Sequence, residues 1–366
     1  MGFNCGIVGL PNVGKSTLFN ALTATQAAEA ANFPFTTIEP NVGRVAVPDA
    51  RLAAVAAIVK PGRVVPTQLE FVDIAGLVKG ASRGEGLGNK FLSHIREVDA
   101  VVHVLRCFED GGIAHVAGVP DPERDAGWVA TELMVADIES LEKRKDGLTK
   151  KARGGDADAA RALDLLTRLV DHLDGGRPAR AFGVEDDERA AFDDFKLLTA
   201  KPTLYVANVD EASAAGGNAL SGAAKRVAEA EGAECVVISA AIEAEIAGLD
   251  SADERAQFLS SLGLAESGLA RLIAAGMRAL DLITFITANA KEAHAWTVKR
   301  GARAPQAAGR VHSDFEKGLI AVEAIGWREF VALGGEGPAR DAGRMRQEGR
   351  DYEVRDGDVL LCRFNV

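Results

Sequence analysis

The sequence predicts an α/β protein built from a doubly wound parallel sheet, a helical hairpin inserted into that domain, and a smaller C-terminal domain. Three observations support this fold class. Short apolar runs alternate with helical patterns over residues 1–124, and the same texture returns over residues 197–280. Residues 125–196 carry long helical periodicity with dense charge instead. From residue 281 to residue 366 the chain has Gly-rich turns and short β-like runs.

The composition of the 366 residues is that of an ordinary globular protein. Hydrophobic residues make up 47% and charged residues 26%, which argues against wholesale disorder. No apolar run approaches the roughly 20 residues that a membrane span needs. The segment Met1–Cys5 lacks the features of a signal peptide, and the four cysteines form no CxxC pair. We therefore expect a cytoplasmic protein with no membrane partner, whose oligomeric state the sequence leaves open.

The apolar runs of the sheet domain are expected to be parallel strands covered on both faces, because several of them lack polar residues almost entirely. In chain order these runs are Phe3–Leu10, Val42–Val47, Leu69–Ile74, Ala100–Cys107, Thr203–Ala207 and Cys235–Ser239.

The inserted segment is predicted to be an antiparallel helical hairpin. Apolar residues recur at helical spacing within 133–141 and within 163–173, and Gly154-Gly155 separates the two patterns.

The strongest chemical signal is Gly9–Ser16, which matches the pattern GxxxxGK[ST] between an apolar strand and a helical stretch. Glycines let successive backbone N–H groups turn towards phosphate oxygens, and the start of the following helix adds its positive dipole end. Lys15 supplies a charge to the β- and γ-phosphates, and the Ser16 hydroxyl can bind Mg²⁺. The strand–loop–helix context favours a phosphate-binding P-loop over an ordinary Gly-rich turn.

Two further segments suit a nucleotide switch. Asp73 and Gly76 form a DxxG motif at the end of an apolar strand, where P-loop proteins place an aspartate near Mg²⁺ and a glycine whose N–H senses the γ-phosphate. The glycine-rich run 80–88 suits a switch loop, and a plain flexible loop is the alternative. In an earlier loop, Thr37 is the expected second Mg²⁺ ligand, with Thr36 the other candidate.

The base-binding elements follow the last two strands of this domain. GTP-binding domains usually carry Asn-Lys-x-Asp here, and that Asp accepts hydrogen bonds from the guanine N1–H and N2 amine. This chain has Val209 and Glu211 in place of the Lys and the Asp, so the guanine clamp is damaged, while Asn208 can still bond the N6/N7 edge of adenine. Ser239 begins the short loop expected to close over the base. The pattern favours ATP over GTP.

Together these motifs resemble the YchF / Obg-like ATPase family. The resemblance rests on the runs GLPNVGKS, FPFTTIEPNVG, DIAGLVKGAS, GEGLGNKF and NVDE in this order, with the helical insertion before the last. In the tail, the runs APQAAG, HSDFEKG and DGD resemble the family's TGS domain, a small β-grasp-like module. The resemblance covers essentially the whole chain. It implies a GTPase-type fold that prefers ATP, Mg²⁺-dependent hydrolysis, and binding to ribosomes.

Carried over residue by residue, the resemblance implies three sets of site residues. The phosphates would contact Asn12, Val13, Gly14, Lys15, Ser16 and Thr17. Mg²⁺ would be held by Ser16 and Thr37, with Asp73 nearby. The base would be surrounded by Asn208, Val209 and Glu211, with the backbone at Val209 in contact with adenine.

The position after the DxxG motif is Leu77, where many switch GTPases have the Gln that orients the attacking water. An aliphatic side chain cannot do so, and hydrolysis is therefore slow or needs another group. In the family a histidine after the fourth strand is a proposed water-positioning residue, and His115 occupies that place, with His94 the other candidate. Asn12 can coordinate K⁺ against the phosphates, or it can simply satisfy the loop backbone.

Three functions remain open on the sequence. The first is an ATPase switch that uses Lys15, Gly76 and His115 in catalysis and docks on the ribosome. The second is a translation-class GTPase, against which Glu211 argues. The third is a ribosome-binding module whose nucleotide is structural and hardly turned over, which Leu77 keeps open.

Charge indicates where a ribosome would be contacted. The net charge of −11 argues against RNA binding by the whole surface. The hairpin's basic cluster within 143–153, and the domain 281–366, in which acidic and basic residues balance, offer local contacts to ribosomal RNA or protein.

Overall fold

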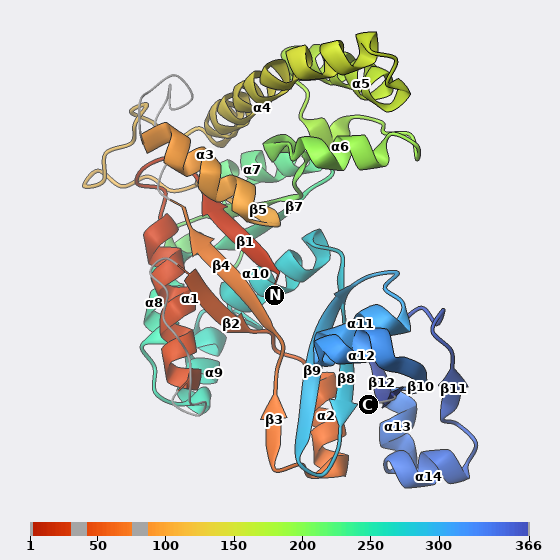
Figure 1. Cartoon of the computed structure of the whole chain (residues 1–366). Helices are drawn as coiled ribbons and strands as arrows, with labels where there is room; N and C mark the ends of the chain where they lie inside the picture. The colour runs from red at the N-terminus through yellow and green to blue at the C-terminus, as the bar shows by residue number, and fades with distance from the viewer. Residues whose placement is uncertain (1–2, 31–41, 75–86, 365–366) are drawn as a thin grey trace. The chain divides into compact units, whose positions relative to one another are not determined.

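The computed structural model describes residues 3–30, 42–74 and 87–364. The chain forms two compact units, each with its own sheet (Figure 1). The first unit comprises residues 1–45 and 70–279, and the second comprises residues 46–69 and 280–366. Within the described part of the chain, no helix combines the length and the apolarity needed to cross a membrane.

The sheet of the first unit has the strand order β2-β4-β1-β5-β6-β7. β1 pairs in parallel with β4 and β5, and β6 pairs in parallel with β5 and β7, as the apolar runs predicted. The strands are β1 (Asn4–Val8), β2 (Val42–Ala46), β4 (Gln68–Asp73), β5 (Ala100–Arg106), β6 (Thr203–Asn208) and β7 (Glu234–Ile238). Every residue of β5 is buried, which explains why its sequence shows no alternation.

Helices join and cover these strands. For example, Ala224 and Ala228 of one helix pack in a core cluster with Tyr205 and Ala207 of β6. The helices of the first unit that precede or follow these strands are α1 (Lys15–Ala30), α3 (Leu87–Glu97), α7 (Ala219–Ala230), α8 (Ala240–Ala247), α9 (Ala252–Ser261) and α10 (Gly268–Ala279). Short 3₁₀ turns lie at η1 (Ala179–Ala181), η2 (Leu198–Ala200) and η3 (Glu211–Ser213).

The predicted hairpin is confirmed as two long helices, α4 (Pro122–Arg153) and α5 (Ala157–Asp174), followed by the shorter α6 (Arg189–Phe195). We call residues 122–195 the arm. α4 begins before the expected residue 125, because the Asp121 side chain accepts from the backbone N–H of Arg124 and Pro122 fits the first turn. Gly154 ends α4, as its sequence predicted.

The sheet of the second unit is mixed, in the order β11-β10-β12-β8-β9-β3. β8 pairs antiparallel with β9 and parallel with β12, and β10 pairs antiparallel with β11 and β12. Its strands are β3 (Arg63–Val65), β8 (Leu282–Ala288), β9 (Glu292–Lys299), β10 (Leu319–Gly326), β11 (Arg346–Glu348) and β12 (Asp358–Phe364). Its helices are α2 (Ala50–Val59), α11 (Ala304–Val311), α12 (Ser313–Gly318), α13 (Trp327–Leu333) and α14 (Glu336–Asp341).

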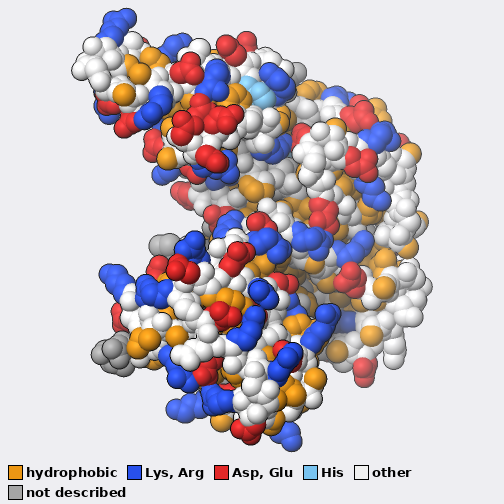
Figure 2. All heavy atoms as spheres, turned by 90° about the vertical axis from the view of Figure 1, so that its right-hand side faces the viewer, with side chains coloured by type: hydrophobic (Ala, Val, Ile, Leu, Met, Phe, Trp, Pro, Cys, Tyr) orange, Lys and Arg blue, Asp and Glu red, His pale blue; other side chains and the backbone are white. Residues whose placement is uncertain are grey.

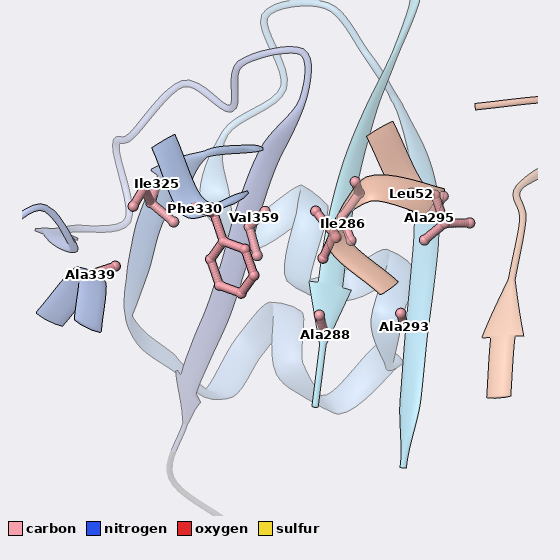
Figure 3. Packing of buried hydrophobic residues seen from close by; sticks show 10 residues of the cluster. Leu52, Ile286, Ala288, Ala293, Ala295, Ile325, Phe330, Ala339 and Val359 are labelled. Carbon is pink, nitrogen blue, oxygen red and sulfur yellow. The ribbon is translucent and has the colours of Figure 1, made fainter. Parts of the chain in front are cut away.

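Both faces of this second sheet carry a core. Val359 belongs to a cluster with Leu52 of α2 and Phe330 of α13, which Figure 3 shows. The next residue, Leu360, belongs to a separate cluster with Ala307 of α11. Successive strand residues point to opposite faces, so the two clusters lie on the two sides of the sheet.

The second unit takes in residues 46–69, which the sequence analysis placed with the first domain. The physical reason is that α2 buries Leu52 and Val55 in a core otherwise built from the C-terminal part of the chain, and β3 pairs in parallel with β9.

Candidate nucleotide-binding site

A cavity of about 800 Å³ lies in the first unit, at the carboxyl ends of its parallel strands. This edge of an open α/β sheet is where such folds bind ligands. The lining residues follow β1, β5, β6 and β7: Asn12, Gly14, Lys15, Ser16, Thr17, Phe108, Glu109, Asp110, Ile113, Asn208, Val209, Asp210, Glu211, Ala212, Ser239, Ala240 and Ala241.

The P-loop, Gly9–Ser16, has a backbone that demands its glycines. Gly14 has φ +96°, and a Cβ on it would lie 2.2 Å from the Asn208 Nδ2 atom. Gly9 has φ +154°, and a Cβ there would lie 2.5 Å from the Val104 carbonyl oxygen. The loop therefore tolerates no side chain at these positions, as the motif predicted.

Lys15 is the first residue of α1, and its ammonium is largely buried. Its Nζ donates to the Leu10 carbonyl at 2.6 Å. Burial lowers the pKa of Lys15 to about 8, and the negative charge of Asp73 opposes this shift. A triphosphate would supply the negative charge that this buried cation lacks.

Ser16 and Asp73 are brought together beside Lys15. Asp73 ends β4 next to Ile7 of β1, and the Ser16 hydroxyl hydrogen-bonds to its carboxylate. Burial raises the pKa of Asp73, while Lys15 and this hydrogen bond lower it. A hydroxyl and a carboxylate are oxygen ligands of the kind Mg²⁺ prefers, so the pair fits that ion. Among the described residues no group of three or more His, Cys, Asp or Glu could hold a metal.

Four positions singled out in the sequence, and residues 80–86 of the glycine-rich run, lie outside the described residues. The four positions are Thr36, Thr37, Gly76 and Leu77.

At the base end of the cavity, Asn208 serves the protein backbone. Its Nδ2 donates to the Val13 carbonyl at 2.9 Å, and its Oδ1 accepts from the Ala240 N–H at 3.0 Å. Asn208 thereby ties the P-loop to the loop that begins at Ser239. The amide keeps a second N–H and a second lone pair, so the expected contact with the adenine edge stays a prediction.

Val209 and Glu211 flank the same end of the cavity. The Val209 side chain is buried in a core cluster, and its N–H donates to the Ile238 carbonyl at 2.8 Å. The Ser239 Oγ is buried and has no hydrogen-bond partner among the described residues. A ligand could therefore be met by the Val209 carbonyl, the Glu211 carboxylate and the Ser239 hydroxyl.

The loop after β5 is a part of the lining that the sequence analysis did not identify. Phe108 and Ile113 both line the cavity. Arg106, one of the most deeply buried side chains, holds this loop by donating to the carbonyls of Phe108, Asp110 and Ile113 at 3.0–3.3 Å. The place of these residues, directly after a buried parallel strand, was the only available signal.

His115 lies in the same loop but does not line the cavity. Its side chain is 1% exposed, and its Nε2 is 3.0 Å from the Asp125 Oδ2. Asn12 reaches the neighbouring residue, since its Nδ2 donates to the Ala114 carbonyl at 3.0 Å. This bond uses the amide nitrogen, whereas K⁺ would be bound by the amide oxygen, so both alternatives for Asn12 stay predictions. His94, the other histidine considered, is exposed on α3.

Two family models match the chain. MMR_HSR1, described as a 50S ribosome-binding GTPase, matches residues 4–145. YchF-GTPase_C, described as a protein of unknown function (DUF933), matches residues 282–365.

Curated relatives match from end to end. The chain is 52% identical over 366 residues to the "Ribosome-binding ATPase YchF" of Pasteurella multocida, with 100% of both chains covered. It is 49% identical over 368 residues to the protein of the same name from Bacillus subtilis, again with 100% of both covered. Among solved structures, the YchF GTPase of Schizosaccharomyces pombe matches with a TM-score of 0.89 and 35% identity, covering 99% of this chain and 98% of that chain. Because identities of 49–52% extend over the full length of such proteins, the chain belongs to the YchF family.

Proposed function

We propose that this protein binds and hydrolyses ATP with Mg²⁺, prefers ATP to GTP, and couples its nucleotide cycle to the ribosome. The observation that carries the proposal is the base end of the cavity, where Val209 and Glu211 replace the Lys and Asp of a guanine clamp. The names of the curated relatives, which call them ribosome-binding ATPases, support the same function.

The preference for adenine follows from the polarity of the groups at that end. The N–H of Val209 is bonded to Ile238, so its carbonyl is the backbone group left for a base. A carbonyl accepts from the N6 amine of adenine but opposes the O6 oxygen of guanine. Glu211 is one methylene longer than the usual Asp, so its carboxylate is displaced from the position that reads guanine N1–H and N2.

The phosphate end supplies charge and a metal site. The P-loop N–H groups and Lys15 would hold the β- and γ-phosphates, and Ser16 and Asp73 would hold Mg²⁺, with Thr37 as the proposed further ligand. Mg²⁺ neutralises charge that develops on the phosphates. Lys15 adds a fixed positive charge at the same place.

Hydrolysis needs a group that orients water, because Leu77 stands where many GTPases have Gln. We assign this role to His115, with Gly76 as the sensor of the γ-phosphate. A contribution of K⁺, bound by the amide oxygen of Asn12, is the weaker proposal, because it rests on the family resemblance alone.

The arm is the proposed ribosome contact in the first unit. Lys150, Lys151 and Arg153 are exposed in the last turn of α4, and no ion pair joins them to another described residue. On the face drawn in Figure 2, Lys and Arg side chains lie among Asp and Glu side chains. The basic cluster of Lys150, Lys151 and Arg153 and the C-terminal unit would each contact ribosomal RNA or protein.

The direct test is sedimentation of the full-length protein with ribosomes, coupled to measurement of ATP hydrolysis. We expect co-sedimentation that depends on nucleotide, and hydrolysis that ribosomes accelerate. Co-sedimentation with no hydrolysis under either condition would instead favour a binding module with a structural nucleotide. Faster turnover of GTP than of ATP would favour a translation-class GTPase.

A further inference from the structure

The loop from Cys107 to Asp121, which we call the β5–α4 loop, is fastened to the nucleotide site. The Asn12 Nδ2 of the P-loop donates to the Ala114 carbonyl at 3.0 Å. On the strand side, the buried Arg106 guanidinium holds three carbonyls of the same loop. The hydrogen bond from Asn12 would therefore transmit a movement of the P-loop on triphosphate binding to the backbone of residue 114.

His115, the next residue, has one ring nitrogen hydrogen-bonded and the other facing a carboxylate. The Ala117 N–H donates to Nδ1 at 3.1 Å, so in the neutral ring the proton is on Nε2. Nε2 lies 3.0 Å from the Asp125 Oδ2, within ion-pair distance but not aligned for a good hydrogen bond. In this position the imidazole does not reach the cavity, because its side chain is 1% exposed and does not belong to the cavity lining.

Asp125 belongs to the arm and is itself fixed. It lies in the first turn of α4, and it is 2% exposed. Its Oδ1 accepts from Arg124 Nε at 3.0 Å and Nη2 at 2.9 Å, and Arg124 Nη2 also donates to the Val119 carbonyl at 2.7 Å. A buried carboxylate oxygen needs a partner, and His115 is the group that faces Oδ2.

We propose that Asp125 is a positioning residue that acts through His115, holding the imidazole in a withdrawn position that must be given up before ATP is hydrolysed. This inference rests on the proposed role of His115 in orienting water. The withdrawn and released positions form a two-state equilibrium, and the carboxylate on the arm stabilises the withdrawn one. A partner that shifts the first turn of α4 therefore releases His115, which links the arm to the chemistry.

The test is single-turnover ATP hydrolysis by the full-length protein without ribosomes. Asp125→Asn keeps the shape of the side chain but removes the charge that holds His115. We expect hydrolysis to become up to about tenfold faster, which corresponds to about 1.4 kcal/mol. ATP affinity should stay unchanged, because Asp125 does not line the cavity. In a His115→Ala background the same substitution should have no effect on the rate.

Imidazole signals provide a readout that a purely structural role would not move. In protein labelled with ¹⁵N-histidine, the His115 signals are identified by their loss in His115→Ala. We expect one fixed tautomer with the proton on Nε2 in the unmodified chain. In Asp125→Asn we expect a shifted Nε2 signal that approaches that of an exposed, exchanging ring.

The matched control is Asp137→Asn, which removes the charge of another buried carboxylate on α4. Asp137 bonds to Leu198 and Thr199 rather than to the β5–α4 loop, so its loss should lower stability and leave the hydrolysis rate unchanged. Asp125→Glu, which keeps the charge but moves it by one methylene, is measured in parallel and should also be faster than the unmodified chain. If Asp125→Asn does not fold, the hydrolysis rate of Asp125→Glu tests the inference in its place.

Hydrolysis that is unchanged or slower in folded Asp125 variants would overturn the inference, as would a rate increase that persists in His115→Ala. Failure of the proposed function has a different signature. The unmodified chain would then not hydrolyse ATP, or it would turn over GTP faster.

Discussion

Lys15 is a buried ammonium, and burial lowers its pKa to about 8 while Asp73 partly restores it. Bound phosphates raise that pKa again, because they place negative charge beside the ammonium. Below about pH 8 the free protein already carries the proton, and ATP affinity should be flat. Above about pH 8, ATP binding must be accompanied by uptake of a proton. The affinity for ATP should therefore fall with pH, by about tenfold per pH unit in the limit.

Calorimetry measures this directly. At about pH 8.5, titrations in buffers of different ionisation enthalpy should show net proton uptake on ATP binding, and the uptake should vanish at about pH 6.5. An affinity for ATP that is constant from about pH 7 to about pH 9.5 would show that Lys15 is not the titrating group. Lys15→Ala should lose tight triphosphate binding at every pH.

Single residues differ in how far the sequence could reveal them. The place of Gly14 and Lys15 in the cavity lining was predictable, because the P-loop motif sets a bare backbone and a cation at fixed spacing. Arg106 and Asp125 were not, since each acts through neighbours that only the folded chain brings together. Asn208 was correctly placed at the cavity. The hydrogen bonds of its amide to Val13 and Ala240 were not predictable, because they join two loops that are distant in sequence.

Among the elements, the arm is held to the sheet domain by a buried carboxylate. Asp137 of α4 is 1% exposed and accepts from the N–H groups of Leu198 and Thr199 at 2.7 and 2.8 Å, and from the Thr199 hydroxyl at 2.7 Å. Asp137→Ala leaves these donors unpaired in the interior. We expect a loss of roughly 3 kcal/mol in the free energy of unfolding, measured by urea denaturation.

A loss below about 0.5 kcal/mol would mean that water replaces the carboxylate and that this contact does not fix the arm. Thr131→Ala, which removes an exposed hydroxyl on the same helix, is the control and should change stability little.

The last turn of α4 gives a test of the arm as a ribosome contact. Reversing the charge of Lys150, Lys151 and Arg153 to Glu should weaken co-sedimentation with ribosomes at least tenfold, because each phosphate contact releases counterions. The affinity for ATP should not change, since none of the three lines the cavity. The loss should be greatest at low salt, where these contacts are strongest.

A matched variant carries the same change of net charge elsewhere in the first unit. Lys225, Arg226 and Arg278 are exposed on α7 and α10, where Arg226 pairs with Glu123 and Arg278 with Glu234. If the variant with all three reversed to Glu folds, its co-sedimentation should stay nearly intact. Equal effects of both triple variants would indicate a general electrostatic effect and would remove the arm from the binding surface.

Periodicity predicted the arm well, since long amphipathic helices broken by Gly154-Gly155 admit few alternatives. It failed to assign residues 46–69. β3 is three residues long and mostly exposed, and α2 is apolar on a face that could cover either sheet. Nothing in local sequence says which core accepts Leu52 and Val55.

For the whole molecule, the two units should respond separately to a core mutation and to nucleotide. Phe330 is buried in the cluster of the second unit, which contains no residue of the ATP cavity. We expect Phe330→Ala to cost about 3–5 kcal/mol in that unit and to lower a thermal transition that ATP does not shift. The transition that ATP raises should stay in place.

Differential scanning calorimetry with and without Mg-ATP separates these responses. A single transition that moves as one with both the mutation and the nucleotide would show that the two units unfold as one cooperative body.

The fold class of the molecule was readable from the sequence, because mostly apolar β-runs such as Ala100–Arg106 alternate with helical patterns, as buried parallel strands do. The phosphate-binding motif Gly9–Ser16 was readable, because it depends on residue spacing alone. The proposed control of hydrolysis through His115 was not readable, because it depends on how the β5–α4 loop packs between the P-loop and the arm.

The central claim is that the altered base motif makes this a protein for ATP rather than GTP. Calorimetric titration of the full-length protein with non-hydrolysable ATP and GTP analogues tests it most directly. Because the Val209 side chain is packed in the core, only Glu211 is changed, to Asp. We predict that the unmodified chain binds the ATP analogue at least tenfold more tightly, about 1.4 kcal/mol, and that Glu211→Asp narrows the gap. A tenfold preference for the GTP analogue in the unmodified chain would contradict the account.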